Sequence, residues 1–151
     1  MSRLIQLVTA ASLVLTLGAC QEETNDEAAL RLVEEGFELT TEVADIFCDC
    51  WDEFNLEGVD SQRECVDRYV RLPSEQRCIK EAYLEDAEAA KIYLECWNEL
   101  QDDLVACMDT RLSCGDPQAA VDCFEDRDIG AQRCIELPES IDRDLGNCFE
   151  G

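Results

Sequence analysis

Two cysteines separated by a single residue, Cys48 and Cys50, are the residues of this chain best placed for chemistry. Thiols at this spacing can close a disulfide and exchange it with a substrate when a helix N-terminus or nearby cations stabilise one thiolate. The neighbours here are Asp45, Asp49 and Asp52, and their negative charges disfavour a thiolate. We therefore expect Cys48 and Cys50 to be bonded to other cysteines, with thiol–disulfide exchange as an alternative function.

The acidic segment 53–64 is a second candidate because it could bind a metal ion. Its spacing resembles the twelve-residue calcium loop of the EF-hand family, with Gly58 at the position of the sharp turn. The resemblance places these residues at ligand positions: Glu53, Asn55, Glu57, Ser61 and Glu64. The segment departs from the family pattern at Glu53, where Asp is usual, and at Asp60, where an apolar residue is usual. The sequence therefore predicts an acidic interhelical loop, with calcium binding as a second alternative.

Other residue patterns that support catalysis are absent from the sequence. It contains no histidine, no Gly-x-Ser-x-Gly turn and no glycine-rich phosphate loop. The 36 Asp and Glu residues make pairs of carboxylates inevitable, so such pairs say nothing about a reaction. We expect a protein that is not an enzyme and holds no cofactor.

The remaining cysteines predict a disulfide framework. Ten cysteines follow Cys20, and an even number in a small exported chain is typical of a disulfide-stapled fold. Because histidine and Cys-x-x-Cys pairs are missing, the usual spacing of a zinc site is missing too. The ten residues are Cys48, Cys50, Cys65, Cys78, Cys96, Cys107, Cys114, Cys123, Cys134 and Cys148.

Eight of these cysteines form two sets with similar spacing, which indicates a weak internal duplication of 48–96 in 107–148. The third cysteine of each set lies in the tetrapeptide Gln-Arg-Cys-Ile, and an aromatic residue follows the fourth. The sets are Cys50, Cys65, Cys78 and Cys96, and Cys107, Cys123, Cys134 and Cys148.

Symmetrical positions across two helical hairpins predict the pairs Cys50–Cys65 and Cys107–Cys123, because antiparallel helices bring such positions together. Three further pairs complete the repeat: Cys78–Cys96, Cys134–Cys148 and Cys48–Cys114. If Cys78 and Cys96 share one straight helix, however, they lie ~27 Å apart and cannot bond. Cys96–Cys134 is then the alternative pair.

The elements that position these residues are predicted to be helices. Apolar residues recur at steps of three and four over 30–54, 61–70 and 75–112. The last of these segments lacks Gly and Pro and is either one helix or two with a break near 85–88. Further helices follow the turn 113–117 and the loop 130–138. No segment alternates as a strand does, so we expect an all-α, disulfide-stapled bundle of about four to five helices.

The N-terminus indicates where the protein is located. Arg3 precedes an apolar run, 4–17, which ends in Leu17-Gly18-Ala19-Cys20. This pattern resembles the lipobox of bacterial lipoproteins, which implies cleavage before Cys20 and a diacylglycerol thioether on its sulfur. The apolar run extends only ~21 Å as a helix, which is too short to span a membrane. The chain thus divides into a signal peptide (1–19), a lipidated acidic tether (20–26) and a cysteine-rich helical domain (27–151).

The net charge limits the classes of partner that we expect, and the residue after Cys20 indicates which membrane holds the protein. The net charge of −24 excludes nucleic acid, whose phosphates would be repelled, and suits a basic protein partner. By the same lipoprotein resemblance, Gln21 in place of Asp favours the outer membrane. We expect a lipoprotein of the bacterial envelope, held to the membrane by lipid on Cys20, with a non-catalytic binding, scaffolding or surface-structural role.

Overall fold

The computed structural model describes residues 23–54 and 56–149, which form an all-α fold stapled by five disulfides. The elements are α1 (Asn25–Cys48), α2 (Gln62–Tyr69), α3 (Pro73–Tyr83), the 3₁₀ helix η1 (Leu84–Asp86), α4 (Ala87–Arg111), α5 (Gln118–Ala131) and α6 (Glu139–Cys148). The predicted fold class is confirmed. The predicted signal peptide and the lipidation site Cys20 lie outside the described residues. No helix in the described ranges has the length and apolar character needed to cross a membrane.

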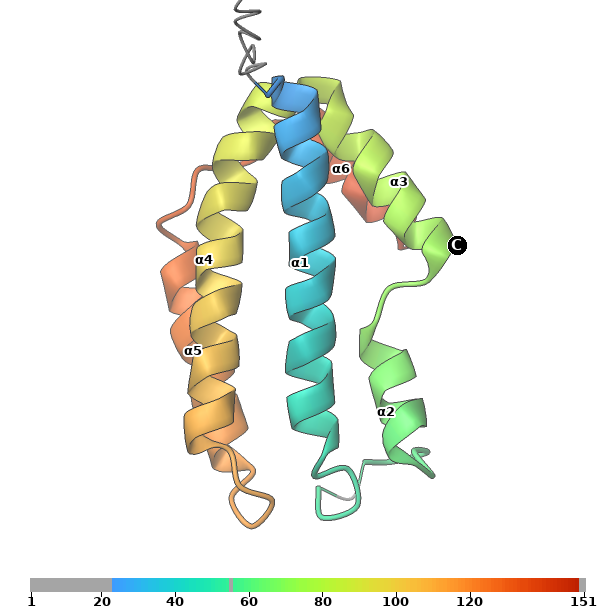
Figure 1. Ribbon diagram of the computed structural model, residues 1–151, viewed down its shortest axis with the longest axis vertical. Helices are drawn as coiled ribbons and strands as arrows, with labels where there is room; N and C mark the ends of the chain where they lie inside the picture. Colours follow the sequence, from blue (N-terminus) through green and yellow to red (C-terminus); the bar gives the residue numbers. More distant parts are fainter. Residues whose placement is uncertain (1–22, 55, 150–151) are drawn as a thin grey trace, which may run out of the picture.

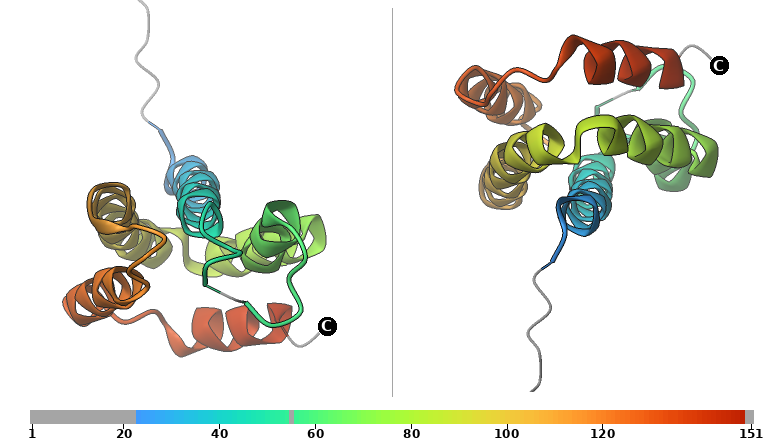
Figure 2. Two further views of the ribbon diagram at one scale, coloured as in Figure 1. Left: turned by 90° about the horizontal axis from the view of Figure 1, so that it is seen from below. Right: turned by 90° about the horizontal axis from the view of Figure 1, so that it is seen from above.

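Two long helices, α1 and α4, form the centre of the molecule. They lie side by side and run in the same direction (Figure 1). After α1 the chain returns through α2 and α3, and after α4 it returns through α5. Seen end-on, α4 and α5 lie on one side, α2 and α3 on the other, and α6 connects the two sides opposite α1 (Figure 2). The helices therefore surround a central region of the fold.

Local hydrogen bonds fix where the helices begin. Thr24 caps α1, and the Glu27 carboxylate accepts a bond from the Thr24 backbone N–H at 3.0 Å, which completes a capping box. The Ser61 hydroxyl accepts a bond from the backbone N–H of Glu64 at the start of α2. The Asp86 side chain likewise accepts a bond from the backbone N–H of Ala89 and so caps α4. Asp86 is the last residue of η1, which lies between α3 and α4. The segment 75–112 is thus two helices, with the break at η1.

The first helix ends earlier than its apolar stripe predicts. α1 stops at Cys48, and turns follow, with the backbone N–H of Trp51 donating to the carbonyl oxygen of Cys48 at 3.3 Å. Phe54 nevertheless packs on Phe47, with ring centroids 5.2 Å apart. The stripe up to residue 54 therefore indicates side chains that pack on the core and are partly buried, and this packing does not require a continuous helix.

Three apolar clusters form the core. One lies between α1, α3, α4 and α6 and includes Leu32, Val33, Ile79, Leu94 and Ile141. A second, toward the other end of α1 and α4, consists of Val43, Leu104, Met108, Ala120 and Cys123. A third surrounds Cys48, Val59 and Cys65. Along α4, two buried polar residues, Asn98 and Gln101, separate the first cluster from the second.

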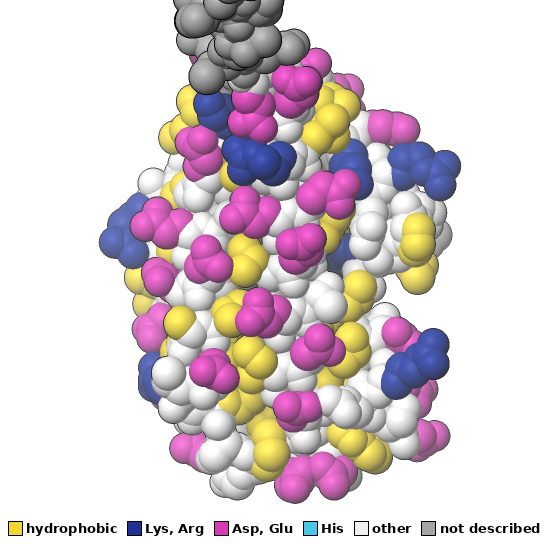
Figure 3. Space-filling model, in the orientation of Figure 1, with side chains coloured by type: hydrophobic (Ala, Val, Ile, Leu, Met, Phe, Trp, Pro, Cys, Tyr) yellow, Lys and Arg dark blue, Asp and Glu magenta, His cyan; other side chains and the backbone are white. Residues whose placement is uncertain are grey.

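The outer surface is strongly acidic. Figure 3 shows Asp and Glu side chains scattered over the face formed by α1 and α4, where they outnumber the basic side chains. Self-repulsion between these charges opposes compaction, and the disulfides act against it by restricting the unfolded chain.

Candidate functional site

The cysteines at the end of α1 pair differently from the prediction. Cys48 is bonded to Cys65 and Cys50 to Cys114, so the predicted pairs Cys50–Cys65 and Cys48–Cys114 are wrong. The prediction extended the first helix to residue 54, which placed Cys50 level with Cys65. Because α1 ends at Cys48, Cys48 itself faces α2, and Cys50 lies in the following turn, from which it reaches the α4–α5 connection.

The predicted bridge between α4 and α5 is confirmed. Cys107 is bonded to Cys123, with their Cα atoms 5.8 Å apart. These two residues lie on either side of the turn at Gly115 and Asp116, where antiparallel helices bring them together as the symmetry of the hairpin requires.

The last two bridges cross between the predicted repeats. Cys78 is bonded to Cys148 and Cys96 to Cys134, so the predicted pairs Cys78–Cys96 and Cys134–Cys148 are wrong, while the alternative Cys96–Cys134 is confirmed. The reason lies in the packing of α3, which contacts α6 closely, whereas α4 turns away at η1 and packs on α5. The third cysteine of each predicted repeat therefore bonds to the fourth cysteine of the other.

These bridges define the environment of the pair first considered for redox chemistry. Cys48 is 0% exposed and Cys50 is 4% exposed, and each sulfur is bonded to a different partner. A disulfide exchange reaction needs an attacking thiol to reach one of the sulfurs. Burial of both residues in separate bridges favours a structural role for them.

The loop after α1 uses its polar groups internally. Ser61 and Glu64 cap α2, and the Glu64 carboxylate accepts a bond from the Asp60 backbone N–H at 2.9 Å. The Arg68 guanidinium donates to the carbonyl oxygens of Glu57, at 3.0 Å, and Gly58. Gly58 has a φ of 68°, the left-handed conformation that glycine adopts readily.

The remaining residues of the EF-hand-like pattern do not complete a ligand set in the described part of the chain. A hydrogen bond with Asp52 raises the pKa of Glu53, and Asn55 lies outside the described residues. Within ranges 23–54 and 56–149, no three His, Cys, Asp or Glu side chains gather as metal ligands do. Calcium binding stays the second alternative function, and thermal unfolding with calcium tests it.

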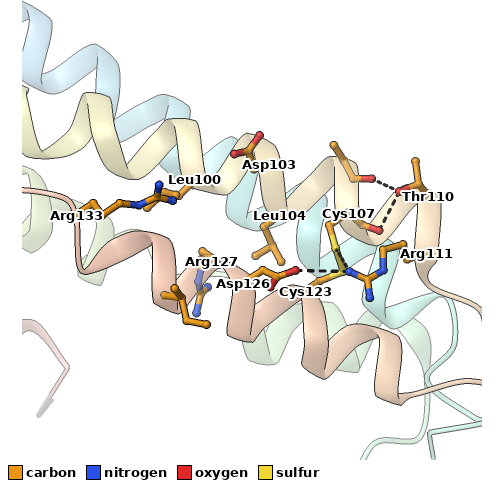
Figure 4. Close-up of a pocket in the computed structure, with 12 residues that line it drawn as sticks. Leu100, Asp103, Leu104, Cys107, Thr110, Arg111, Cys123, Asp126, Arg127 and Arg133 are labelled. Atoms are coloured by element: carbon orange, nitrogen blue, oxygen red, sulfur yellow. Dashed lines mark hydrogen bonds and ion pairs between the residues drawn. A yellow bond between two sulfur atoms is a disulfide. The ribbon is translucent and has the colours of Figure 1, made fainter.

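A surface hollow of about 650 Å³ lies between α4 and α5 (Figure 4). Two of its charged residues, Arg111 and Asp126, pair with each other, and Arg111 also pairs with Asp122 beside the groove. Arg111 lies 3.4 Å from Asp122 and 3.6 Å from Asp126, and one of its nitrogens is 3.6 Å from the Cys107 sulfur. The Thr110 hydroxyl donates to the Ala106 carbonyl oxygen at 2.7 Å. The groove is therefore lined by both acidic and basic side chains, and part of its charge is used in ion pairs within the protein.

A second cavity, of about 410 Å³, lies in the central region that the helices surround. Residues of α1, α3, α4, α5 and α6 line it, together with Arg71 from the α2–α3 connection. Its volume falls in the range of small-molecule sites. The lining is rich in aromatic residues: Phe37, Tyr83, Tyr93, Trp97 and Phe149.

The aromatic residues form a ladder that ends at a cation. Tyr83 stacks on Tyr93, with centroids 6.5 Å apart, and Tyr93 stacks on Trp97 at 6.2 Å and an interplanar angle of 9°. The Arg127 guanidinium lies 5.4 Å from the centre of the Trp97 ring. On another part of the lining, Arg71 lies 4.4 Å from the centre of the Phe149 ring.

Two polar residues of the lining are themselves almost fully buried. Asn98 is 4% exposed and Gln101 is 6% exposed. The Asn98 amide donates to the Leu32 carbonyl oxygen at 2.8 Å, but neither side-chain oxygen has a hydrogen-bond partner among the described residues. Sequence reasoning missed both residues, although they continue the helical stripe that joins Leu94 to Leu104, where a polar residue is a signal in itself.

Comparison of the chain with protein families, with curated proteins and with solved structures finds no match.

Proposed function

We propose that this protein is a lipid-anchored lipoprotein of the bacterial envelope whose helical domain has a non-catalytic binding or scaffolding role. The observation that carries the proposal is the disulfide frame. Each of the six described α-helices contains or adjoins a bridged cysteine, and all ten cysteines from Cys48 to Cys148 are paired. A frame of this kind holds a rigid surface in place and leaves these cysteines without a thiol for redox chemistry.

The frame also supports export. Disulfides persist in oxidising compartments, such as the bacterial periplasm and the cell surface, and are rare in the cytosol. Export is what the segment Leu17-Gly18-Ala19-Cys20 implies through its resemblance to a lipobox. Because α1 begins at Asn25, an acyl chain on Cys20 would hold the folded domain close to the membrane surface.

The lipid anchor is tested by the mass of the N-terminal peptide. The full-length chain is expressed in a bacterium with two membranes, and the protein is extracted and digested. We expect a peptide that begins at Cys20 and carries a diacylglycerol group. A Cys20→Ser variant is the control, and we expect it to lack the lipid mass. An N-terminal peptide with an unmodified Cys20 thiol contradicts the proposal.

A single substitution, Gln21→Asp, tests whether the protein is held in the outer or the inner membrane. We expect the wild-type protein in the outer-membrane fraction of a density gradient, because Gln21 follows the lipidated residue. Gln21→Asp changes only that residue, and we expect it to shift the protein to the inner-membrane fraction. If the wild-type protein is found in the inner membrane, the outer-membrane assignment is wrong while the lipid anchor stands.

A further inference from the structure

We propose that the central cavity binds a small organic anion with a flat apolar ring system. The inference rests on the proposed binding role and specifies its ligand class. Three observations carry it: the aromatic lining, the charge of that lining, and the unpartnered amide of a buried residue.

The aromatic ladder supplies the apolar contact. Tyr83, Tyr93 and Trp97 line one continuous stretch of the cavity, and Phe37 and Phe149 line other parts. Aromatic rings bind one another through offset-stacked and edge-to-face contacts, which a flat ring system in the cavity can make with them. Burial raises the pKa of Tyr83 and of Tyr93, so both phenols stay neutral at physiological pH.

The charge of the lining is opposite to that of the protein. The chain carries 36 acidic and 12 basic residues, yet the charged residues that line the cavity are Arg71 and Arg127, and none of the described lining residues is acidic. Asp128, exposed outside the lining, pairs with Arg127 at 2.6 Å and offsets part of its charge. Two guanidinium groups and no carboxylate in the lining favour an anion in this cavity, although the chain as a whole is acidic. Arg127 lies at the edge of both hollows, since it also lines the α4–α5 groove.

The third observation concerns Gln101. Its side-chain oxygen has no hydrogen-bond partner among the described residues, although the residue is 6% exposed. A buried amide oxygen without a partner lowers stability, and a donor that satisfies it recovers that free energy. The terminal torsion of a glutamine has only weak preferences, so the amide can turn its oxygen toward the cavity that Gln101 lines. A hydroxyl on the ring of the ligand is the matching donor.

Calorimetric titration with three probes of one shape tests the ligand class. The full-length lipidated protein is held in phosphatidylcholine nanodiscs, and empty nanodiscs serve as the blank. The probes are naphthoate, naphthylmethanol and naphthylmethylammonium, which are an anion, a neutral molecule and a cation. We expect naphthoate to bind with an affinity about tenfold or more above that of the neutral probe, and the cation to bind most weakly. If only the net charge of −24 acted, the cation would bind most tightly and the anion most weakly. The probe series therefore distinguishes binding in the cavity from non-specific electrostatic attraction.

Variants locate the site. We expect Arg71→Gln combined with Arg127→Gln to weaken naphthoate about tenfold and to remove the preference for the anion. Arg133→Gln is the matched control, because Arg133 lines the α4–α5 groove and not the central cavity. We expect it to leave naphthoate binding unchanged. Hydroxynaphthoate should bind more tightly than naphthoate by about twofold to tenfold, and Gln101→Leu should abolish that difference.

Three results overturn the inference. In the first, naphthoate shows no saturable binding, and in the second, the cationic probe binds as tightly as naphthoate. In the third, Arg133→Gln lowers the affinity for naphthoate as much as the double variant does. The probe series on the wild-type protein decides the ligand class even if a variant fails to fold. Failure of the inference leaves the lipid mass on Cys20 and the bridge pattern untouched, so it is distinguishable from failure of the proposed function.

Discussion

The side-chain amide of Asn98 in α4 donates a 2.8 Å hydrogen bond to the backbone oxygen of Leu32 in α1. This bond links the two central helices in the interior of the fold. The contact requires close approach. A Cβ atom added to Gly36, one turn beyond Leu32, would lie 3.0 Å from the Asn98 side-chain oxygen. Glycine at position 36 thus permits the contact, although glycine inside a helix lowers its stability relative to alanine.

Gly36→Ala is expected to destabilise the fold for this reason. Asn98 is buried and its amide nitrogen is bonded, so the side chain cannot move aside freely, and crowding of about 1–3 kcal/mol outweighs the gain of up to about 1 kcal/mol that alanine brings to a helix. Gly146→Ala in α6 is the control, because a Cβ there has open space within 4 Å, and we expect a gain of up to about 1 kcal/mol. Urea unfolding of both variants measures the difference. Equal stability of the two variants contradicts the close contact.

Cys114→Ala tests the structural role of the cysteines at the end of α1. The substitution leaves Cys50 without a partner, two residues from the Cys48–Cys65 bridge. We expect Cys50 to remain a free, blockable thiol while Cys48–Cys65 persists, because the acidic neighbours disfavour the thiolate that exchange requires. Peptide mapping after alkylation measures this. A Cys48–Cys50 bond with a free Cys65 supports exchange chemistry instead.

Glu85 should make stability depend on pH. A hydrogen bond and the like charge of Asp144 raise the pKa of Glu85, so the folded state binds this proton more readily than the unfolded state. The folded state therefore gains stability as pH falls through that pKa and loses it as pH rises. We expect Glu85→Gln to raise Tm at neutral pH, with a gain that shrinks as the solution is acidified. Glu42→Gln on α1 is the control, and an identical pH profile for both variants rules out the pairing.

Calcium addition is expected to leave the Tm of the protein unchanged. Ser61 and Glu64 already cap α2, and the Arg68 guanidinium, which donates to the carbonyl oxygens of Glu57 and Gly58, places a positive charge in the loop that a cation would have to enter. Thermal unfolding with calcium, with magnesium as the control, measures this. A calcium-dependent rise in Tm that Glu64→Ala abolishes would instead establish the EF-hand-like site.

Periodicity and caps predict several elements of this fold well because α1, α2 and α4 each begin at a side-chain cap and carry an apolar stripe. The segment 61–70 predicts α2 closely, with Ser61 as its cap, whereas α3 begins at Pro73, two residues before the predicted segment 75–112. The end of α1 is missed because Trp51 and Phe54 extend the stripe into a turn, where tertiary packing rather than helical geometry partly buries them. That single error shifts the predicted partners of Cys48 and Cys50.

The central cavity could not be predicted in the same way. Its residues come from five helices and a connection, and their meeting depends on α6 crossing opposite α1. The Cys78–Cys148 and Cys96–Cys134 bridges that support this arrangement cross between the predicted repeats, and spacing along the sequence favours pairs within a repeat. Asn98 and Gln101 are the one local signal, since each places a polar side chain on a buried stripe.

Disulfide mapping of the protein without reduction, after free thiols have been blocked, tests the stapled, non-redox frame most directly. The predicted result is five bridges with no blocked cysteine among the ten, and with Cys48 bonded to Cys65 and Cys50 to Cys114. A bond between Cys48 and Cys50, or a blocked thiol at either residue, would contradict the frame and make thiol–disulfide exchange the better description of this protein.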